Sequence, residues 1–123
     1  MGASFAVRES KLPGCVTIAV EGELDIKTAK TVEDAVQRAC AGGCEELVVD
    51  LGELTFIDSS GVRALFSAVN ACAAVYSALE IVPSRHPAPA NALRALGLER
   101  RLPWRGGALP VWGPGEGPEG DGR

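Results

Sequence analysis

The spacing of apolar residues changes at one point in the chain, and this change most limits the folds open to it. From Cys15 to Leu24, apolar and polar residues alternate, as in a strand with one buried face. After about Asp25, apolar residues recur every three or four positions, as in a helix with one buried face, at Ala29, Val32, Val36, Ala39 and Cys40. A strand that leads directly into an amphipathic helix is typical of α/β domains.

Similar patterns extend over most of the chain. Phe5 and Val7 indicate a first strand, and Pro13-Gly14 joins it to the second as a hairpin. Further strands are predicted at residues 47–51 and 79–82, and helices at residues 60–76 and 88–96, while residues 98–104 are either irregular or an edge strand. The order β-β-α-β-α-β-α predicts a single α/β domain with a mixed sheet, helices packed on it and right-handed parallel connections.

Composition separates one domain from a tail. The 123 residues suit one ordinary core, which we expect to span residues 1–105. Residues 106–123 are dominated by Gly and Pro, and we expect them to form a disordered tail. The net charge of −4 argues against a general nucleic-acid binder.

The chain is expected to be cytoplasmic and not to bind membranes. Arg8, Glu9 and Lys11 interrupt the first apolar stretch, which does not fit a signal peptide. The longest stretch without a charge, residues 64–79, is too short to span a bilayer comfortably. The four cysteines lack the spacing of a zinc site, so we expect free thiols, no metal and no cofactor.

Two short loops are the candidate functional segments. Gly22-Glu23-Leu24-Asp25 follows one predicted strand, and Asp58-Ser59-Ser60-Gly61 precedes the second long helix. In open α/β sheets, ligands gather outside the carboxyl ends of the strands. Ser59 lies where a helix N-cap is expected, and capping alone is enough to explain a serine there. The same position tolerates a phosphate, because helix N-termini carry unpaired N–H groups and a partial positive charge.

Together these segments resemble the STAS domain family, and within it the stand-alone bacterial anti-sigma factor antagonists. The resemblance rests on Gly22-Glu23-Leu24-Asp25 followed by a helix, and on Leu47-Val48-Val49-Asp50-Leu51 running into Phe56-Ile57-Asp58-Ser59-Ser60-Gly61-Val62. It covers roughly residues 5–104. The family often ends in another amphipathic helix, and here Gly106-Gly107 and Pro110 replace it.

The resemblance implies a partner switch without enzymatic activity. The unphosphorylated chain is expected to bind an anti-sigma factor that is also a serine kinase, and so to release a sigma factor. Phosphorylation of Ser59 is expected to end that binding, and a serine phosphatase to restore it. We expect a monomer or weak homodimer whose partner-binding residues are Gly22, Glu23, Leu24, Asp25, Asp58, Ser59, Ser60, Gly61 and Arg63.

Two other functions remain open from the sequence. A STAS module could hold a nucleotide or another anion at the same helix N-terminus without regulating a sigma factor. The sequence contains no Walker-type loop and no dinucleotide glycine pattern. A hydrolase would need a base for Ser59, and the single histidine, His86, is expected in an exposed turn.

Overall fold

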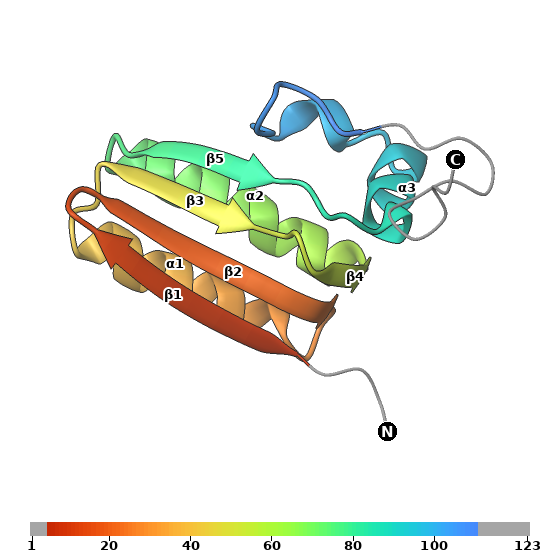
Figure 1. The fold of residues 1–123 in the computed structure, drawn as a ribbon, viewed down its shortest axis with the longest axis horizontal. Coiled ribbons are helices and arrows are strands. Elements are labelled where there is room, and N and C mark those ends of the chain that lie inside the picture. Colours follow the sequence, from red (N-terminus) through yellow and green to blue (C-terminus); the bar gives the residue numbers. More distant parts are fainter. Residues whose placement is uncertain (1–4, 111–123) are drawn as a thin grey trace.

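The computed structural model describes residues 5–110, which form a five-stranded sheet with helices α1 and α2 lying along one of its faces (Figure 1). The strands are β1 (Ala6–Leu12), β2 (Cys15–Leu24), β3 (Glu46–Asp50), β4 (Leu54–Ile57) and β5 (Ala78–Val82). The helices are α1 (Ala29–Ala41), α2 (Ser59–Ala74), α3 (Pro87–Ala95) and a short 3-10 turn, η1 (Glu99–Arg101). The predicted α/β class with a mixed sheet is confirmed.

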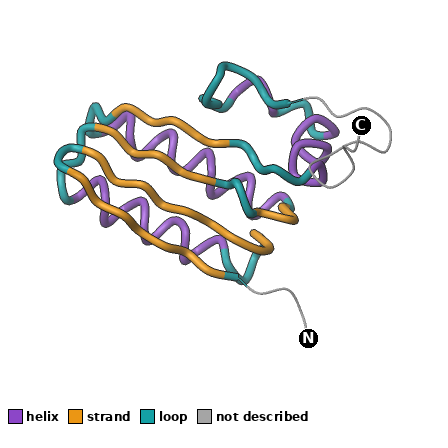
Figure 2. Tube along the Cα trace, viewed as in Figure 1, coloured by secondary structure: helices purple, strands orange, loops and turns teal. Residues whose placement is uncertain are grey.

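Four strands follow the order β1-β2-β3-β5 across the sheet (Figure 2). The predicted hairpin is present, because β1 and β2 are antiparallel and Leu12 pairs with Cys15 at the turn. The β2–β3 and β3–β5 pairs are parallel. Each parallel pair is joined through a helix, which places the carboxyl ends of β2, β3 and β5 at the same edge of the sheet.

The sequence interpretation missed one strand, β4, which pairs with the end of β2 instead of extending the main order. The β2–β3 pairing stops at Ala19, and the parallel β2–β4 pairing begins at Gly22. The register shifts between Gly22 and Glu23, and Gly22 has a φ of 93°, a left-handed conformation that suits glycine. Strand β2 therefore pairs with β3 up to Ala19 and with β4 from Gly22 onward.

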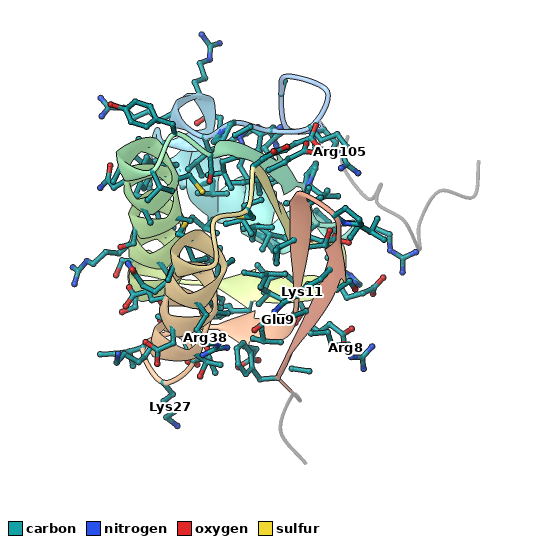
Figure 3. The ribbon with its side chains drawn as sticks, turned by 90° about the vertical axis from the view of Figure 1, so that its left-hand side faces the viewer. Arg8, Glu9, Lys11, Lys27, Arg38 and Arg105 are labelled. Atoms are coloured by element: carbon teal, nitrogen blue, oxygen red, sulfur yellow. The ribbon has the colours of Figure 1, made fainter. Side chains whose placement is uncertain are left out.

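Helix α1 packs as its sequence pattern predicts. The five apolar residues of the predicted face are all buried, at Ala29, Val32, Val36, Ala39 and Cys40. The helix ends at Ala41, directly before the Gly42-Gly43 stop. On its flank, Arg38 and Glu9 of β1 point toward one another (Figure 3) and form an ion pair with an Nη2–Oε2 distance of 2.9 Å. The core lies between the helices and the sheet, and includes Ile18, Val49 and Leu65 at 0% exposure.

Helix α2 ends earlier than predicted. Its last residue is Ala74, and Tyr76 has a positive φ of 58° and is 96% exposed. The prediction that this helix extends to residue 76 was therefore wrong at this end. The residues that α2 buries are Gly61, Val62, Ala64, Leu65, Ala68 and Cys72.

The C-terminal part of the described chain folds against α3 and β5. Helix α3 is present within one residue of its predicted bounds, and it ends at Ala95 with Leu96 as its C-cap. Residues 98–104 do not form an edge strand. They contain η1 and one isolated bridge, between Trp104 and Ile81 of β5. Trp104 is buried, and its Nε1–H donates to the carbonyl oxygen of Glu99 at 2.6 Å.

Five residues of the expected tail are among those described. Leu109 is buried, and the guanidinium of Arg94 donates to the carbonyl oxygens of Leu109 and Pro110. Residues 111–123, where the remaining prediction of disorder falls, lie outside the described residues. Within residues 5–110, no helix combines the length and the apolar character that crossing a membrane requires.

Candidate functional site

Strand β4 brings the two candidate loops together. The pairs Glu23–Phe56 and Leu24–Ile57 align the end of β2 with the end of β4. Just beyond them, the backbone N–H of Asp58 donates to the carbonyl oxygen of Leu24 at 3.2 Å. Segments 22–25 and 58–61 are therefore neighbours at the edge of the sheet where β2 and β4 end.

The N-cap of α2 is Asp58, so the expectation that Ser59 caps this helix was wrong. Asp58 has an extended backbone, and its Oδ1 accepts hydrogen bonds from the N–H groups of Ser60 at 2.9 Å and Gly61 at 3.2 Å. These are two of the N–H groups that a helix start leaves unpaired. Because the aspartate performs the capping, the serine is not needed for it.

Ser59 is consequently the first residue inside α2, and it is exposed. No hydrogen bond joins its hydroxyl to any residue between 5 and 110. The neighbouring Ser60 is half-buried. Of the two serines in the segment, Ser59 is therefore the one whose hydroxyl is open to a second protein.

Gly61 lets α2 approach the end of β2 closely. A Cβ atom at Gly61 would lie 2.6 Å from the carbonyl oxygen of Leu24 and 2.7 Å from Cγ1 of Ile57. Both distances are below any ordinary contact, and one of the two atoms belongs to the backbone. Leu24 and Gly61 are both buried, so they hold the site together from inside instead of forming its surface.

Thr28 fixes the first loop, a role that the sequence interpretation missed. Its Oγ1 donates to the carbonyl oxygen of Glu23 and accepts from the N–H of Asp25, both at 2.9 Å. Thr28 also occupies the N-cap position of α1, without a side-chain cap bond to that helix. The Asp25 carboxylate accepts from the N–H of Lys27 at 2.9 Å. Threonine three residues after aspartate was the local signal for such a turn.

The remaining candidate residues form the outer surface of the site. Glu23, Ser59 and Arg63 are exposed, and Gly22, Asp25, Asp58 and Ser60 are half-buried. Two exposed apolar side chains that were not predicted accompany them in sequence: Ile26, which is 76% exposed, and Phe56, which is 43% exposed. Single exposed apolar side chains are ordinary on protein surfaces, so these two do not by themselves mark a binding site.

His86 does not occupy the exposed turn that the sequence suggested. It is half-buried at the N-cap position of α3, its N–H donates to Ser84 Oγ at 2.9 Å, and its Nε2 lies 3.9 Å from Oε1 of Glu53. Among the described residues, no group of three or more His, Cys, Asp or Glu side chains is arranged to hold a metal ion.

Comparison with known proteins gives a family match over most of the chain. Residues 7–105 match the family model described as "Mlab, STAS domain". No curated protein matches the chain. Among solved structures, an anti-sigma factor antagonist from Mycobacterium paratuberculosis shares 26% identity over 88% of this chain and 87% of its own, with a TM-score of 0.65.

Two further solved structures share the fold at lower identity. A putative anti-sigma factor antagonist from Thermotoga maritima has a TM-score of 0.68 at 15% identity, over 80% of this chain and 84% of its own. The phosphorylated form of the Bacillus cell fate determinant SpoIIAA has a TM-score of 0.59 at 24% identity, over 77% of this chain and 85% of its own.

Proposed function

Because this chain belongs to the STAS domain family, we propose that it is an anti-sigma factor antagonist controlled by phosphorylation of Ser59. In its unphosphorylated form it binds an anti-sigma factor with serine kinase activity, and a sigma factor is released. Phosphorylation ends this binding, and a serine phosphatase reverses it. The chain itself catalyses no reaction and acts in the cytoplasm as a monomer or weak homodimer.

One observation carries this proposal: the Ser59 hydroxyl is exposed at the start of α2, while Asp58 makes the capping hydrogen bonds. A serine that is exposed and not needed for capping can gain a phosphate without loss of the helix start. Glu23, Asp25 and Arg63 add charges to the same surface. Likeness to several anti-sigma factor antagonists supports the choice of partner.

In the proposed reaction, Ser59 Oγ attacks the γ-phosphorus of ATP. A new O–P bond forms, the bond from the γ-phosphorus to the bridging oxygen breaks, ADP leaves, and the hydroxyl proton passes to a base. Asp58 Oδ1 is occupied by two backbone N–H groups, whereas no described residue bonds its Oδ2. Oδ2 is therefore the oxygen that would orient the hydroxyl in the kinase complex.

A phosphate at this position weakens an interface through its charge. Phosphoserine carries about −1.5 to −2 charge at neutral pH. Two unit charges about 4 Å apart interact by about 4 kcal/mol at an effective dielectric constant near 20. Since each 1.4 kcal/mol is about tenfold in affinity, one uncompensated phosphate lowers affinity by two to three orders of magnitude.

The test is calorimetric binding to the individually expressed anti-sigma factors of the source organism. The unmodified chain and Ser59→Ala are expected to bind the same partner with similar affinity. Ser59→Asp is expected to bind at least tenfold more weakly. After incubation with the partner and ATP, intact-mass analysis should find one added phosphoryl group on the unmodified chain and none on Ser59→Ala.

Ser10→Asp is the matched control, because Ser10 is also exposed but lies in β1 near the hairpin turn, at the opposite end of the sheet. It adds the same charge and should leave affinity unchanged. Undiminished binding by Ser59→Asp, with the partner identified, would contradict the proposed switch. Binding of a nucleotide to the isolated chain, with a rise in its melting temperature, would instead favour the anion-binding module.

A further inference from the structure

Arg63 lies one helical turn after Ser59 on the same side of α2. Residues four positions apart in a helix are surface neighbours, with Cβ atoms about 5–6 Å apart. Helical side chains also tilt toward the N-terminus, so a long side chain covers the turn that precedes it. An arginine side chain at position 63 can therefore reach the first turn, where the Ser59 hydroxyl is exposed.

The guanidinium of Arg63 has no partner among residues 5–110. Four other arginines are held in ion pairs: Arg8 with Glu21, Arg38 with Glu9, Arg85 with Glu53 and Arg105 with Glu80. Arg63 is exposed, and it makes neither an ion pair nor a hydrogen bond within this part of the chain. A positive charge without a partner thus stands one turn from the proposed modification site.

We propose that Arg63 is the intramolecular counter-ion of a phosphate on Ser59. This inference rests on the proposed phosphorylation, and adds a residue that distinguishes the two forms of the chain. The arrangement has the favourable order for a helical ion pair, with the acidic group N-terminal to the basic one. A guanidinium also presents two parallel N–H groups that match two phosphate oxygens.

The other charges near Ser59 are less suited to this role. Lys30 already donates to the Asp34 carboxylate at 2.8 Å. Lys27 is exposed, but it belongs to the loop before α1, and its side chain points away from the ribbon (Figure 3). The Asp58 carboxylate repels a phosphate, although its two bonds from backbone N–H groups reduce that effect.

The ion pair between phosphorylated Ser59 and Arg63 changes the charge that a partner meets on the surface around Ser59. Without phosphate, Arg63 is available to a carboxylate of the partner protein. With phosphate, the same guanidinium is held within α2, and the partner's carboxylate meets a surface of net negative charge. Phosphorylation then acts on the interface twice, by adding negative charge and by withdrawing a positive one.

The test is a double-mutant cycle on the full chain, with phosphoserine placed at residue 59 by genetic encoding. Unfolding by urea at low salt is measured for the phosphorylated and unphosphorylated forms of the parent chain and of Arg63→Gln. Phosphorylation is expected to stabilise the parent more than the variant, with a coupling of about twofold in the unfolding constant. The coupling should disappear in high salt, since the pair is exposed.

Lys27→Gln is the matched control, because it removes another exposed positive charge, from the loop before α1, without changing α2. Phosphorylation should stabilise Lys27→Gln as much as it stabilises the parent chain. An NMR readout tests the contact itself: the Nε–H signal of Arg63 should shift on phosphorylation in the folded chain. Absence of coupling, equal coupling through Lys27, or an unshifted Arg63 signal would each overturn the proposal.

This experiment can fail independently of the proposed function. Because the phosphate is introduced without a kinase and no partner is present, the outcome does not depend on a cellular kinase or on an anti-sigma factor. If phosphorylation abolished partner binding but showed no coupling to Arg63, the proposed switch would be supported. Only the role of Arg63 as counter-ion would be ruled out.

Discussion

A Cβ atom on Gly61 would lie 2.6 Å from the carbonyl oxygen of Leu24. That oxygen also accepts the N–H of Asp58, so it lies between the cap of α2 and the first turn of that helix. The close approach needs a residue without a side chain, and it fixes the distance between the two candidate loops. The geometry of the site is thus set by the packing of a helix on the end of a strand.

Gly61→Ala is expected to destabilise the domain by about 1–3 kcal/mol, the usual cost of forcing an extra methyl group into a packed site. The measurement is urea unfolding followed by circular dichroism. Gly42→Ala is the matched control. Its backbone has a φ of −76°, and an added Cβ would have its nearest contact at 3.4 Å. Equal stability of the two variants would show that α2 can move away from Leu24 at little cost.

Asp58→Ala removes the acceptor for two backbone N–H groups of α2 and is expected to cost about 1 kcal/mol. Asp58→Asn retains an oxygen at this position and should cost less, because asparagine is also a favoured N-cap. Thermal unfolding of both variants separates the hydrogen bonds from the charge. If asparagine proved as destabilising as alanine, the charge near the helix N-terminus would be the main contribution.

Thr28→Val keeps the shape of the side chain but removes its bonds to Glu23 and Asp25. We expect it to lower stability by about 1 kcal/mol, the typical net contribution of such bonds. We also expect weaker binding to the proposed anti-sigma factor, because the loop loses its fixed shape. Thr31→Val is the control, because Thr31 is exposed in α1 and its side chain makes no hydrogen bond to any residue from 5 to 110. A binding loss of the same size in both variants would argue against a role for this loop.

The buried thiol of Cys72 makes stability depend on pH in the alkaline range. Burial, together with the neighbouring Cys40 and Cys44, raises the pKa of Cys72 from its ordinary value of 9.0 to about 12. The unfolded chain therefore loses this proton at lower pH than the folded chain. The contribution is complete below pH 9.0 and is lost as pH rises toward about 12.

The measurement is the free energy of unfolding of the parent and of Cys72→Ala between neutral pH and alkaline pH. The variant should be less stable throughout, because it leaves a cavity in the core. Its stability should also fall less steeply with pH than that of the parent. Parallel curves would show that Cys72 ionises normally in the folded chain.

The elements that follow long apolar patterns were predictable, and the strand that builds the site was not. Helix α1 buries the face that its sequence indicates, over nearly four turns. Strand β4 has only four residues, and Thr55 and Phe56 in its middle are both exposed, so no alternation is visible. Its pairing depends on the register shift at Gly22, about thirty residues earlier in the chain.

Within the site, the position of the N-cap of α2 could not be predicted from the sequence either. Aspartate and serine are about equally good N-caps, so the segment Asp58-Ser59 leaves two helix starts open. The hydrogen bond from Asp58 to Leu24 of a different strand selects between them. The neighbouring segments were predictable from their motifs, but the residue left with a free hydroxyl depends on this contact across the sheet.

The hydrogen bonds on either side of Ser59 determine the shape in which the chain would present this serine to the proposed kinase. The N–H of Asp58 is bound to β2, and those of Ser60 and Gly61 are bound to the Asp58 carboxylate, so the backbone around the serine has one shape. A peptide of residues 54–64 lacks β2 and is too short to remain helical in water. An enzyme that modifies Ser59 has to recognise a folded surface, and short synthetic peptides would make poor substitutes for the domain.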